Sequence, residues 1–108
     1  MPPTEDTPEM AAEDLVEAVL SLVERVPAGR ATTFGTLAAA VGTGPRQVGR
    51  IMSLHGAAVT WWRVVRADGT LPAYLRDRAV AAYAAEGTPL RPGTARPAVD
   101  LRAAGWEP

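Results

Sequence analysis

Apolar residues recur at helical spacing over the first quarter of the chain, and this pattern predicts an amphipathic helix. We expect it to begin with Thr7 as a hydroxyl cap and Pro8 in the first turn, because both residue types favour these positions. Pro27 cannot continue a helix, so the helix should end near Arg25. The stripe that this helix would bury consists of Leu15, Val19, Leu22 and Val26.

Two shorter helices are expected next. Residues 34–41 are mostly apolar, with Thr33 as a cap in front and Gly42 as a stop behind. Pro45 suits the first turn of a further helix over residues 45–54. Two short helices joined by a short turn that contains glycine are typical of a helix-turn-helix motif.

The second half of the chain contains a segment typical of β structure, followed by a further predicted helix. Residues 61–66 are rich in aromatic and β-branched residues, and Asp68 with Gly69 follows as a tight turn, which predicts a small β-hairpin wing. A fourth helix is expected over residues 76–86, followed by a loop rich in proline and glycine. Val99 to Trp106 should fold back as a last short element. The expected fold is therefore mainly α, a winged helix-turn-helix domain with a small β-hairpin wing.

Length and composition agree with one small domain. The 108 residues are 47% hydrophobic and 21% charged, which is close to ordinary globular usage. We expect a disordered tail over residues 1–6 and a single domain over residues 7–108. There is no apolar run long enough to span a membrane and no signal-peptide pattern at the start. A cytoplasmic protein without a membrane partner is expected.

Charge is strongly segregated along the chain, although the net charge is only -1. Residues 1–24 hold seven acids and no base, whereas residues 25–67 hold six arginines and no acid. A basic block of this kind indicates a polyanionic partner. Arg46, Gln47 and Arg50 occupy the first half of the second helix of the pair, the part that enters a DNA groove in such motifs. A solvated arginine face on an ordinary helix pair is the alternative.

The absence of cysteine and the single histidine restrict the possible chemistry. No disulfide, thiolate nucleophile or cysteine-ligated metal site can form. His55 stands before Gly56 with no nucleophile-elbow motif around it, which favours a polar helix end over a catalytic base. We therefore expect no cofactor and no metal.

Several motifs occur in an order that resembles the DNA-binding domain of O6-alkylguanine-DNA alkyltransferases. Residues 26–29 with 32–35 are similar to Ile-Pro-x-Gly followed by Thr-Tyr-Gly, and residues 46–49 are similar to the Arg-x-Val-Gly of the recognition helix. Residues 60–64 lie where the transferases carry Pro-Cys-His-Arg-Val. The likeness covers about residues 14 to 106 and is greatest to the alkyltransferase-like proteins, which keep this domain and lack the acceptor cysteine.

The resemblance implies recognition of a damaged base by flipping it out of the duplex. The helix pair would dock in the minor groove, Arg46 would enter the base stack as an arginine finger, and the alkylated guanine would occupy a pocket. Trp61 would form an aromatic wall of this lesion pocket, with Tyr74, Met52 and Val64 as further lining residues.

The remaining DNA contacts implied by the resemblance lie at the starts of the two helices. Phe34 takes the place of a tyrosine that presses on the phosphate beside the flipped base. Thr33, Gln47 and Arg50 complete the predicted DNA-binding set, with phosphates bound by Arg50 and by backbone amides.

Each assignment has an alternative in ordinary packing. Trp61 and Trp62 would point to opposite faces of a strand, so one of them belongs to the core, and the motif favours Trp61 as the pocket residue. Phe34, Tyr74 and Met52 could equally be core residues. Arg63 could be a structural ion-pair partner of Glu86, since Trp62 replaces the histidine with which the family's acid interacts.

Alkyl transfer needs a thiolate, and this chain has none. The resemblance therefore implies a non-enzymatic protein that binds double-stranded DNA containing O6-alkylguanine and marks the lesion for nucleotide excision repair. The expected partners are this DNA and nucleotide excision repair proteins, and the protein should be a monomer associated with the nucleoid. One alternative is a sequence-specific winged helix-turn-helix transcriptional regulator. A second is a glycosylase or lyase, but such an enzyme needs a placed acid or amine, and this chain has no lysine.

Overall fold

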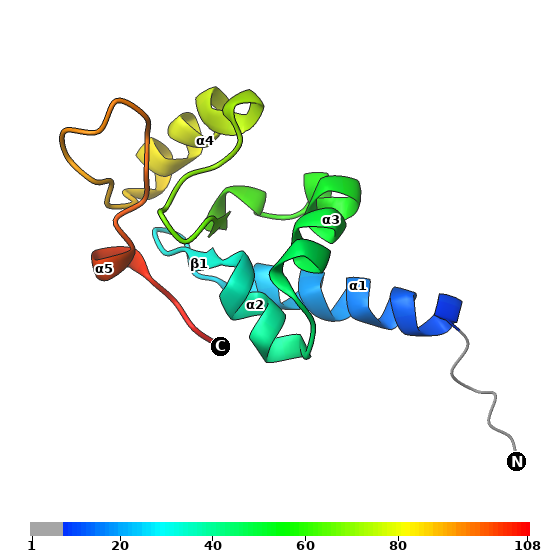
Figure 1. Ribbon diagram of the computed structural model, residues 1–108. Coiled ribbons are helices and arrows are strands. Elements are labelled where there is room, and N and C mark those ends of the chain that lie inside the picture. Colours follow the sequence, from blue (N-terminus) through cyan, green and yellow to red (C-terminus); the bar gives the residue numbers. More distant parts are fainter. Residues whose placement is uncertain (1–7) are drawn as a thin grey trace, which may run out of the picture.

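The computed structural model describes residues 8–108, and it consists mainly of helices (Figure 1). The predicted tail at residues 1–6 and the Thr7 cap lie outside the described residues. No helix in the described range is both long and apolar enough to cross a membrane. The elements in chain order are α1 (Pro8–Arg25), β1 (Thr32–Thr33), α2 (Phe34–Val41), α3 (Pro45–His55), the 3-10 helices η1 (Gly56–Ala58) and η2 (Trp61–Arg63), β2 (Val64–Val65), α4 (Ala73–Glu86) and α5 (Leu101–Ala104).

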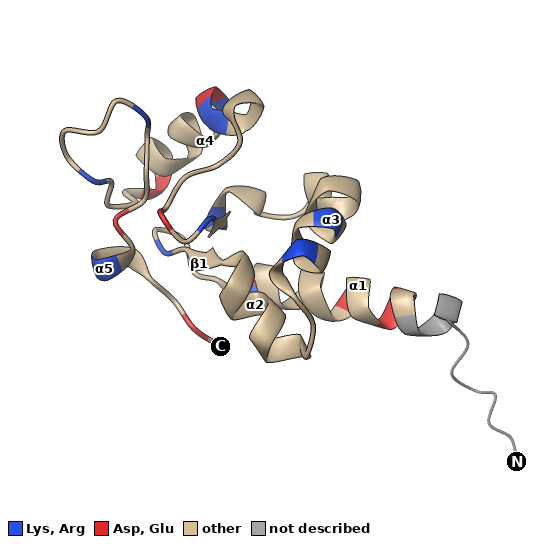
Figure 2. Ribbon diagram, in the orientation of Figure 1, with Lys and Arg blue, Asp and Glu red and all other residues tan. Residues whose placement is uncertain are grey.

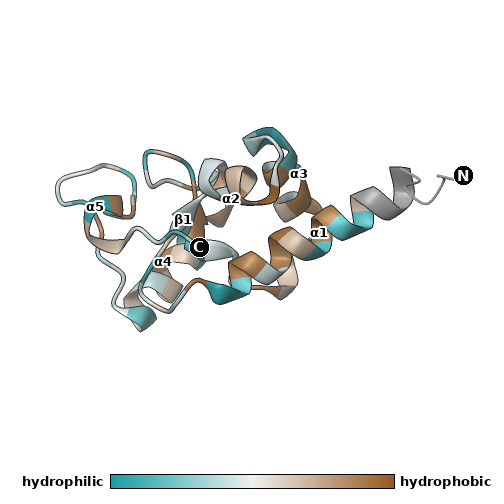
Figure 3. Cartoon of the chain, turned by 90° about the horizontal axis from the view of Figure 1, so that it is seen from below, coloured by the Kyte–Doolittle hydropathy of each residue, from teal (hydrophilic) through white to brown (hydrophobic). Residues whose placement is uncertain are grey.

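The first three helices form one half of the molecule, with α2 and α3 packed over α1 (Figure 1). Apolar and polar stretches alternate along α1, as its amphipathic sequence predicts (Figure 3). The Thr33 hydroxyl caps α2 by accepting a hydrogen bond of 3.0 Å from the Thr36 N–H, and Gly42 ends α2 at φ 78°. The predicted helix-turn-helix is thus confirmed. The buried residues of this first core are Val19, Val23, Leu37, Ala38, Val48, Ile51 and Val64.

The small sheet differs from the predicted hairpin wing. Trp61–Arg63 is a 3-10 helix, and only Val64–Val65 is extended. This strand pairs in parallel with Thr32–Thr33, with Thr32 opposite Val64. The predicted turn is present, because the N–H of Thr70 donates to Asp68 Oδ1 at 3.0 Å and Gly69 has φ 84°. β1 supplies the partner of β2, and Pro72 cannot donate to a second strand after the turn.

The two residues of β2 connect two separate cores. Neighbouring side chains on a strand point to opposite faces, and Val64 accordingly enters the first core while Val65 enters the second. α4 begins at Ala73, three residues before the predicted start, and ends at Gly87. The C-terminal segment folds back as expected, because the Trp106 N–H donates to the Ala31 carbonyl at 2.8 Å. The second core consists of Ala31, Val65, Leu71, Ala79, Tyr83, Val99 and Ala104.

Candidate nucleic-acid interface and base pocket

A pocket of about 190 Å³ lies where α3, the two 3-10 helices and the start of α4 meet. All four predicted lesion-pocket residues line it: Met52 from α3, Trp61 from η2, Val64 from β2 and Tyr74 from α4. Phe34, from the first residue of α2, lines it too. The structure thus brings together residues that are up to 44 positions apart in the sequence. The full lining is Phe34, Gly49, Met52, Ser53, Gly56, Ala57, Trp61, Val64, Leu71, Pro72, Tyr74, Leu75 and Arg78.

The pocket walls are mostly apolar, and two aromatic rings stand out among them. Trp61 is partly buried and packs against the second core, while Tyr74 is 74% exposed at the start of α4. A flat aromatic wall beside an open rim can stack a nucleobase, because every base has a π face. An apolar slot with few polar groups is also typical of small-ligand sites.

Trp62 has different surroundings from Trp61. It does not line this pocket but packs against the second core, where its carbonyl accepts a 2.7 Å hydrogen bond from the Tyr83 hydroxyl. Its ring meets that of Trp61 edge to face at 5.5 Å and 87°. The Trp62 indole N–H is buried and has no hydrogen-bond partner among the described residues. Trp62 is therefore a packing residue beside the pocket.

The exposed face of α3 carries the predicted DNA-contacting side chains. Arg46, Gln47 and Arg50 are all exposed in the first half of this helix. Neither arginine forms an ion pair with any residue in the described part of the chain. Figure 2 shows basic positions on α3 and acidic positions on α1, so the two kinds of charge lie on different helices. This leaves the α3 face able to bind an anion.

Phe34 and Thr33 lie at the junction of β1 and α2. Phe34 is partly buried, packs against the first core and also lines the pocket. The packing alternative is therefore observed, and the phosphate contact of Phe34 stays a prediction. The Thr33 hydroxyl accepts from the Thr36 N–H and donates to the Thr36 hydroxyl at 2.9 Å. Since this hydroxyl is used for capping, any DNA contact at Thr33 would involve its backbone.

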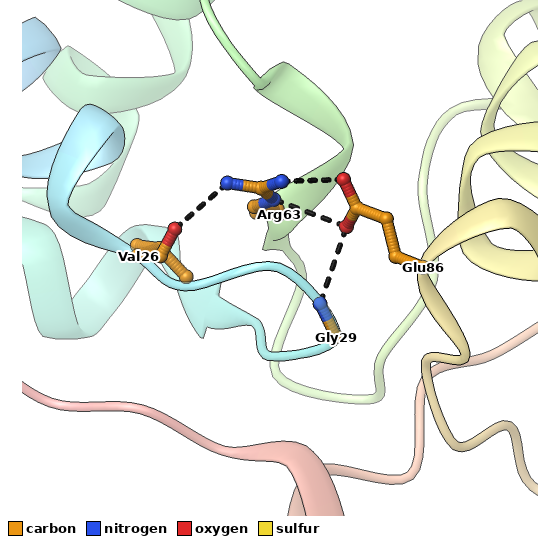
Figure 4. Close-up of polar contacts among 4 residues, drawn as sticks. All are labelled: Val26, Gly29, Arg63 and Glu86. Atoms are coloured by element: carbon orange, nitrogen blue, oxygen red, sulfur yellow. Dashed lines mark hydrogen bonds and ion pairs between the residues drawn. The ribbon is translucent and has the colours of Figure 1, made fainter.

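Behind the pocket, Arg63 and Glu86 form an ion pair that links both halves of the molecule (Figure 4). Arg63 Nε donates to Glu86 Oε1 at 3.1 Å, and its Nη1 donates to the Val26 carbonyl at 2.9 Å. The Gly29 N–H donates to the same carboxylate at 3.3 Å. The Arg63 hydrogen bonds hold the pKa of Glu86 below its ordinary value of 4.5. The ion pair considered from the sequence is thus confirmed, and it fixes the segment that carries Trp61.

Arg78 is a charged pocket residue that was not identified from the sequence. Its guanidinium carbon lies 5.9 Å from the centroid of the Trp61 ring. Arg78 follows Tyr74 by four positions, so the two share one face of α4. The predicted helix began at residue 76 and left Tyr74 outside it. A helix beginning at Ala73 would have placed both side chains beside the pocket.

The comparisons with known proteins identify a DNA-binding family. The family model described as "6-O-methylguanine DNA methyltransferase, DNA binding domain" matches residues 14–88, which is more than half of the chain. No curated protein sequence matches at a significant level.

Two solved structures from S. pombe share the fold. The chain is 25% identical to S. pombe Atl1 in complex with damaged DNA containing O6-carboxymethylguanine, with a TM-score of 0.76. It is 28% identical to S. pombe ATL in complex with DNA, with a TM-score of 0.73. Each match covers 89% of this chain and 97% of the other. Both similar structures are therefore of proteins bound to DNA.

Proposed function

Because the chain belongs to the family of the 6-O-methylguanine DNA methyltransferase DNA-binding domain, we propose that it recognises O6-alkylguanine in duplex DNA without removing the alkyl group. The observation that carries this proposal is the pocket, where Trp61, Met52, Val64 and Tyr74 meet beside an α3 face that presents exposed arginines. The two DNA-bound S. pombe proteins support it, one of them with an O6-alkylated guanine in its DNA.

In the proposed mechanism, contacts with the protein offset the free energy that is needed to move a base out of the duplex. Unstacking and unpairing a nucleotide costs a few kcal/mol. Arg46, exposed near the start of α3, would fill the vacated place in the stack, and the extruded guanine would enter the pocket. The alkyl group would contact the Trp61 ring and the apolar side chains of Met52 and Val64. Arg50 would hold a phosphate and so fix the register of the helix on the duplex.

Recognition without transfer follows from the nucleophiles that the chain possesses. Transfer of an alkyl group to a protein of this family requires a thiolate, and the sequence contains no cysteine. Met52 lines the pocket, but its neutral thioether is a weak nucleophile. We therefore propose that the bound lesion stays intact and that the complex marks it for nucleotide excision repair, with the protein acting as a monomer.

The test is a binding titration at fixed salt with two duplexes that differ only in guanine or O6-methylguanine at one position. The native chain should prefer the lesion duplex. Trp61→Ala should reduce this preference, because the pocket loses its aromatic wall, whereas Arg46→Ala should weaken binding to both duplexes. Trp106→Ala is the matched control, since Trp106 lies in the C-terminal segment and does not line the pocket.

Equal binding to both duplexes by the native chain would refute lesion recognition. A strong preference for one undamaged palindromic sequence would instead indicate a transcriptional regulator. Mass spectrometry of the protein and of the DNA after incubation tests whether an alkyl group is transferred. The masses of the protein and of the DNA should both be unchanged, and a protein heavier by one alkyl group would contradict recognition without transfer.

A further inference from the structure

Among the described residues that line the pocket, Arg78 is the only one with a formal charge. The other lining residues are apolar, aromatic, glycine or the neutral Ser53. A charge beside apolar walls interacts more strongly with a ligand charge than it would in water. The described part of the pocket lining therefore has one cation and no anion, and this difference bears on which alkyl groups the pocket prefers.

The guanidinium of Arg78 is not engaged by another protein group in the described range of residues. It forms no ion pair and donates no hydrogen bond there, and its one recorded contact is with the Trp61 ring at 5.9 Å. The neighbouring arginines differ in this respect. Arg63 is bound to Glu86, and Arg76 Nε donates to the Leu71 carbonyl at 3.2 Å. Arg78 thus keeps its fork of N–H donors available at the pocket wall.

Resting on the proposed function, we propose that Arg78 makes the pocket selective for O6-alkyl groups that end in a carboxylate, over neutral groups of the same size. The guanidinium fork matches the two oxygens of a carboxylate, and such charge-assisted pairs are stronger than neutral hydrogen bonds. The guanidinium lies 5.9 Å from the centroid of the Trp61 ring, which is the ring that the alkyl group would contact under the proposed function. The chemical class of the preferred lesion is therefore an anionic alkyl adduct.

The test compares two nearly isosteric lesions in one duplex sequence, O6-carboxymethylguanine and the neutral O6-carbamoylmethylguanine, with O6-methylguanine and guanine as references. The native chain should bind the carboxymethyl duplex about fivefold to tenfold more tightly than the carbamoylmethyl duplex, because only the carboxylate can pair with the Arg78 guanidinium. The expected factor is no larger because Arg78 is exposed at the rim, where water partly screens its charge. Arg78→Gln should remove this difference, and Arg78→Lys should keep part of it. The preference for O6-methylguanine over guanine should survive in Arg78→Gln.

Arg76→Gln is the matched control, because Arg76 is on the same helix and does not line the pocket. It should keep the native ratio between the two lesions. Equal affinities of the native chain for the two lesions, both above guanine, would overturn the role of Arg78 and leave the proposed function intact. Arg78→Gln weakening all four duplexes equally would show a phosphate contact and would also overturn it. If no lesion duplex is preferred over guanine, the proposed function itself fails.

Discussion

Trp61 and Trp62 are consecutive in the sequence but have separate roles in the structure. The sequence analysis divided them by assuming a strand, in which neighbours point to opposite faces. The residues form a 3-10 helix instead, and there too consecutive side chains diverge. The division into a pocket residue and a packing residue was therefore predictable, although the conformation that produces it was not.

The place of Arg78 beside the pocket could not be predicted from the sequence pattern alone. Its position four residues after Tyr74 has meaning only once α4 is known to begin at Ala73. Helix starts are poorly defined where no side-chain cap is present, and Pro72 offers none. The motif positions, by contrast, predicted Met52, Trp61, Val64 and Tyr74 as neighbours, and the structure places them around one pocket.

Glu86 gives a prediction about stability and pH. The side chains of Glu86 and Arg63 are each only 14% exposed, so Glu86→Gln should lower the free energy of unfolding at neutral pH by about 1.5–3 kcal/mol. The pKa of Glu86 is lowered in the folded state, so the stabilisation is present above the ordinary value of 4.5 and is lost as the pH falls through the folded pKa. Urea unfolding of both proteins from pH 7 to pH 3 should show the difference shrinking at the acid end.

The control for this measurement is Glu24→Gln, because Glu24 is exposed on α1 and forms no ion pair within the described residues. Its stability should match that of the native chain within about 0.5 kcal/mol across the range. A difference between native and Glu86→Gln that does not change with pH would argue against the ion pair as its source.

At the scale of the element, the junction of β1 and α2 can be tested through its cap. Thr33→Ala removes the hydroxyl that accepts from the Thr36 N–H, so the free energy of unfolding should fall by about 1 kcal/mol. Thr33→Ser keeps the hydroxyl and should retain most of the stability. Denaturant unfolding of the three proteins measures this directly. A serine variant as unstable as the alanine variant would show that the Thr33 methyl group, rather than the cap, is responsible.

The helices were more predictable than the sheet for a physical reason. Thr33, Gly42 and Pro45 are local signals that act within one turn of their own helix. The pairing of Val64–Val65 with Thr32–Thr33 joins residues 32 positions apart, and no local pattern specifies that partner. The tight turn at Asp68 was correctly predicted because its hydrogen bonds are local. The pairing of these two strands therefore escaped prediction, and the turn did not.

At the scale of the whole molecule, the separation of charge predicts how DNA binding depends on salt. The basic positions lie on α3 and the acidic positions on α1 (Figure 2). If Arg50 holds a phosphate, Arg50→Ala should make the slope of log affinity against log salt concentration less negative by about 1. Titrations at several salt concentrations give this slope. Arg102→Ala, on α5, should leave it unchanged, and an equal change in both variants would contradict a contact specific to α3.

The two cores and the Arg63–Glu86 pair determine how the pocket is held. The first core supports α3, the second supports α4, and the pocket lies between these helices. The ion pair connects Arg63, which directly precedes β2, to the end of α4 and to the backbone after α1 (Figure 4). The pocket wall at Trp61 is therefore fixed by contacts from both halves of the chain.

The most direct test of the central claim is a crystal structure of the native chain with a duplex containing one O6-methylguanine. The alkylated guanine should be rotated out of the duplex into the pocket, with its methyl group against the Trp61 ring. Arg46 should occupy the vacated place in the base stack. A complex in which the O6-methylguanine remains stacked and paired inside the duplex, with no base in the pocket, would contradict the account.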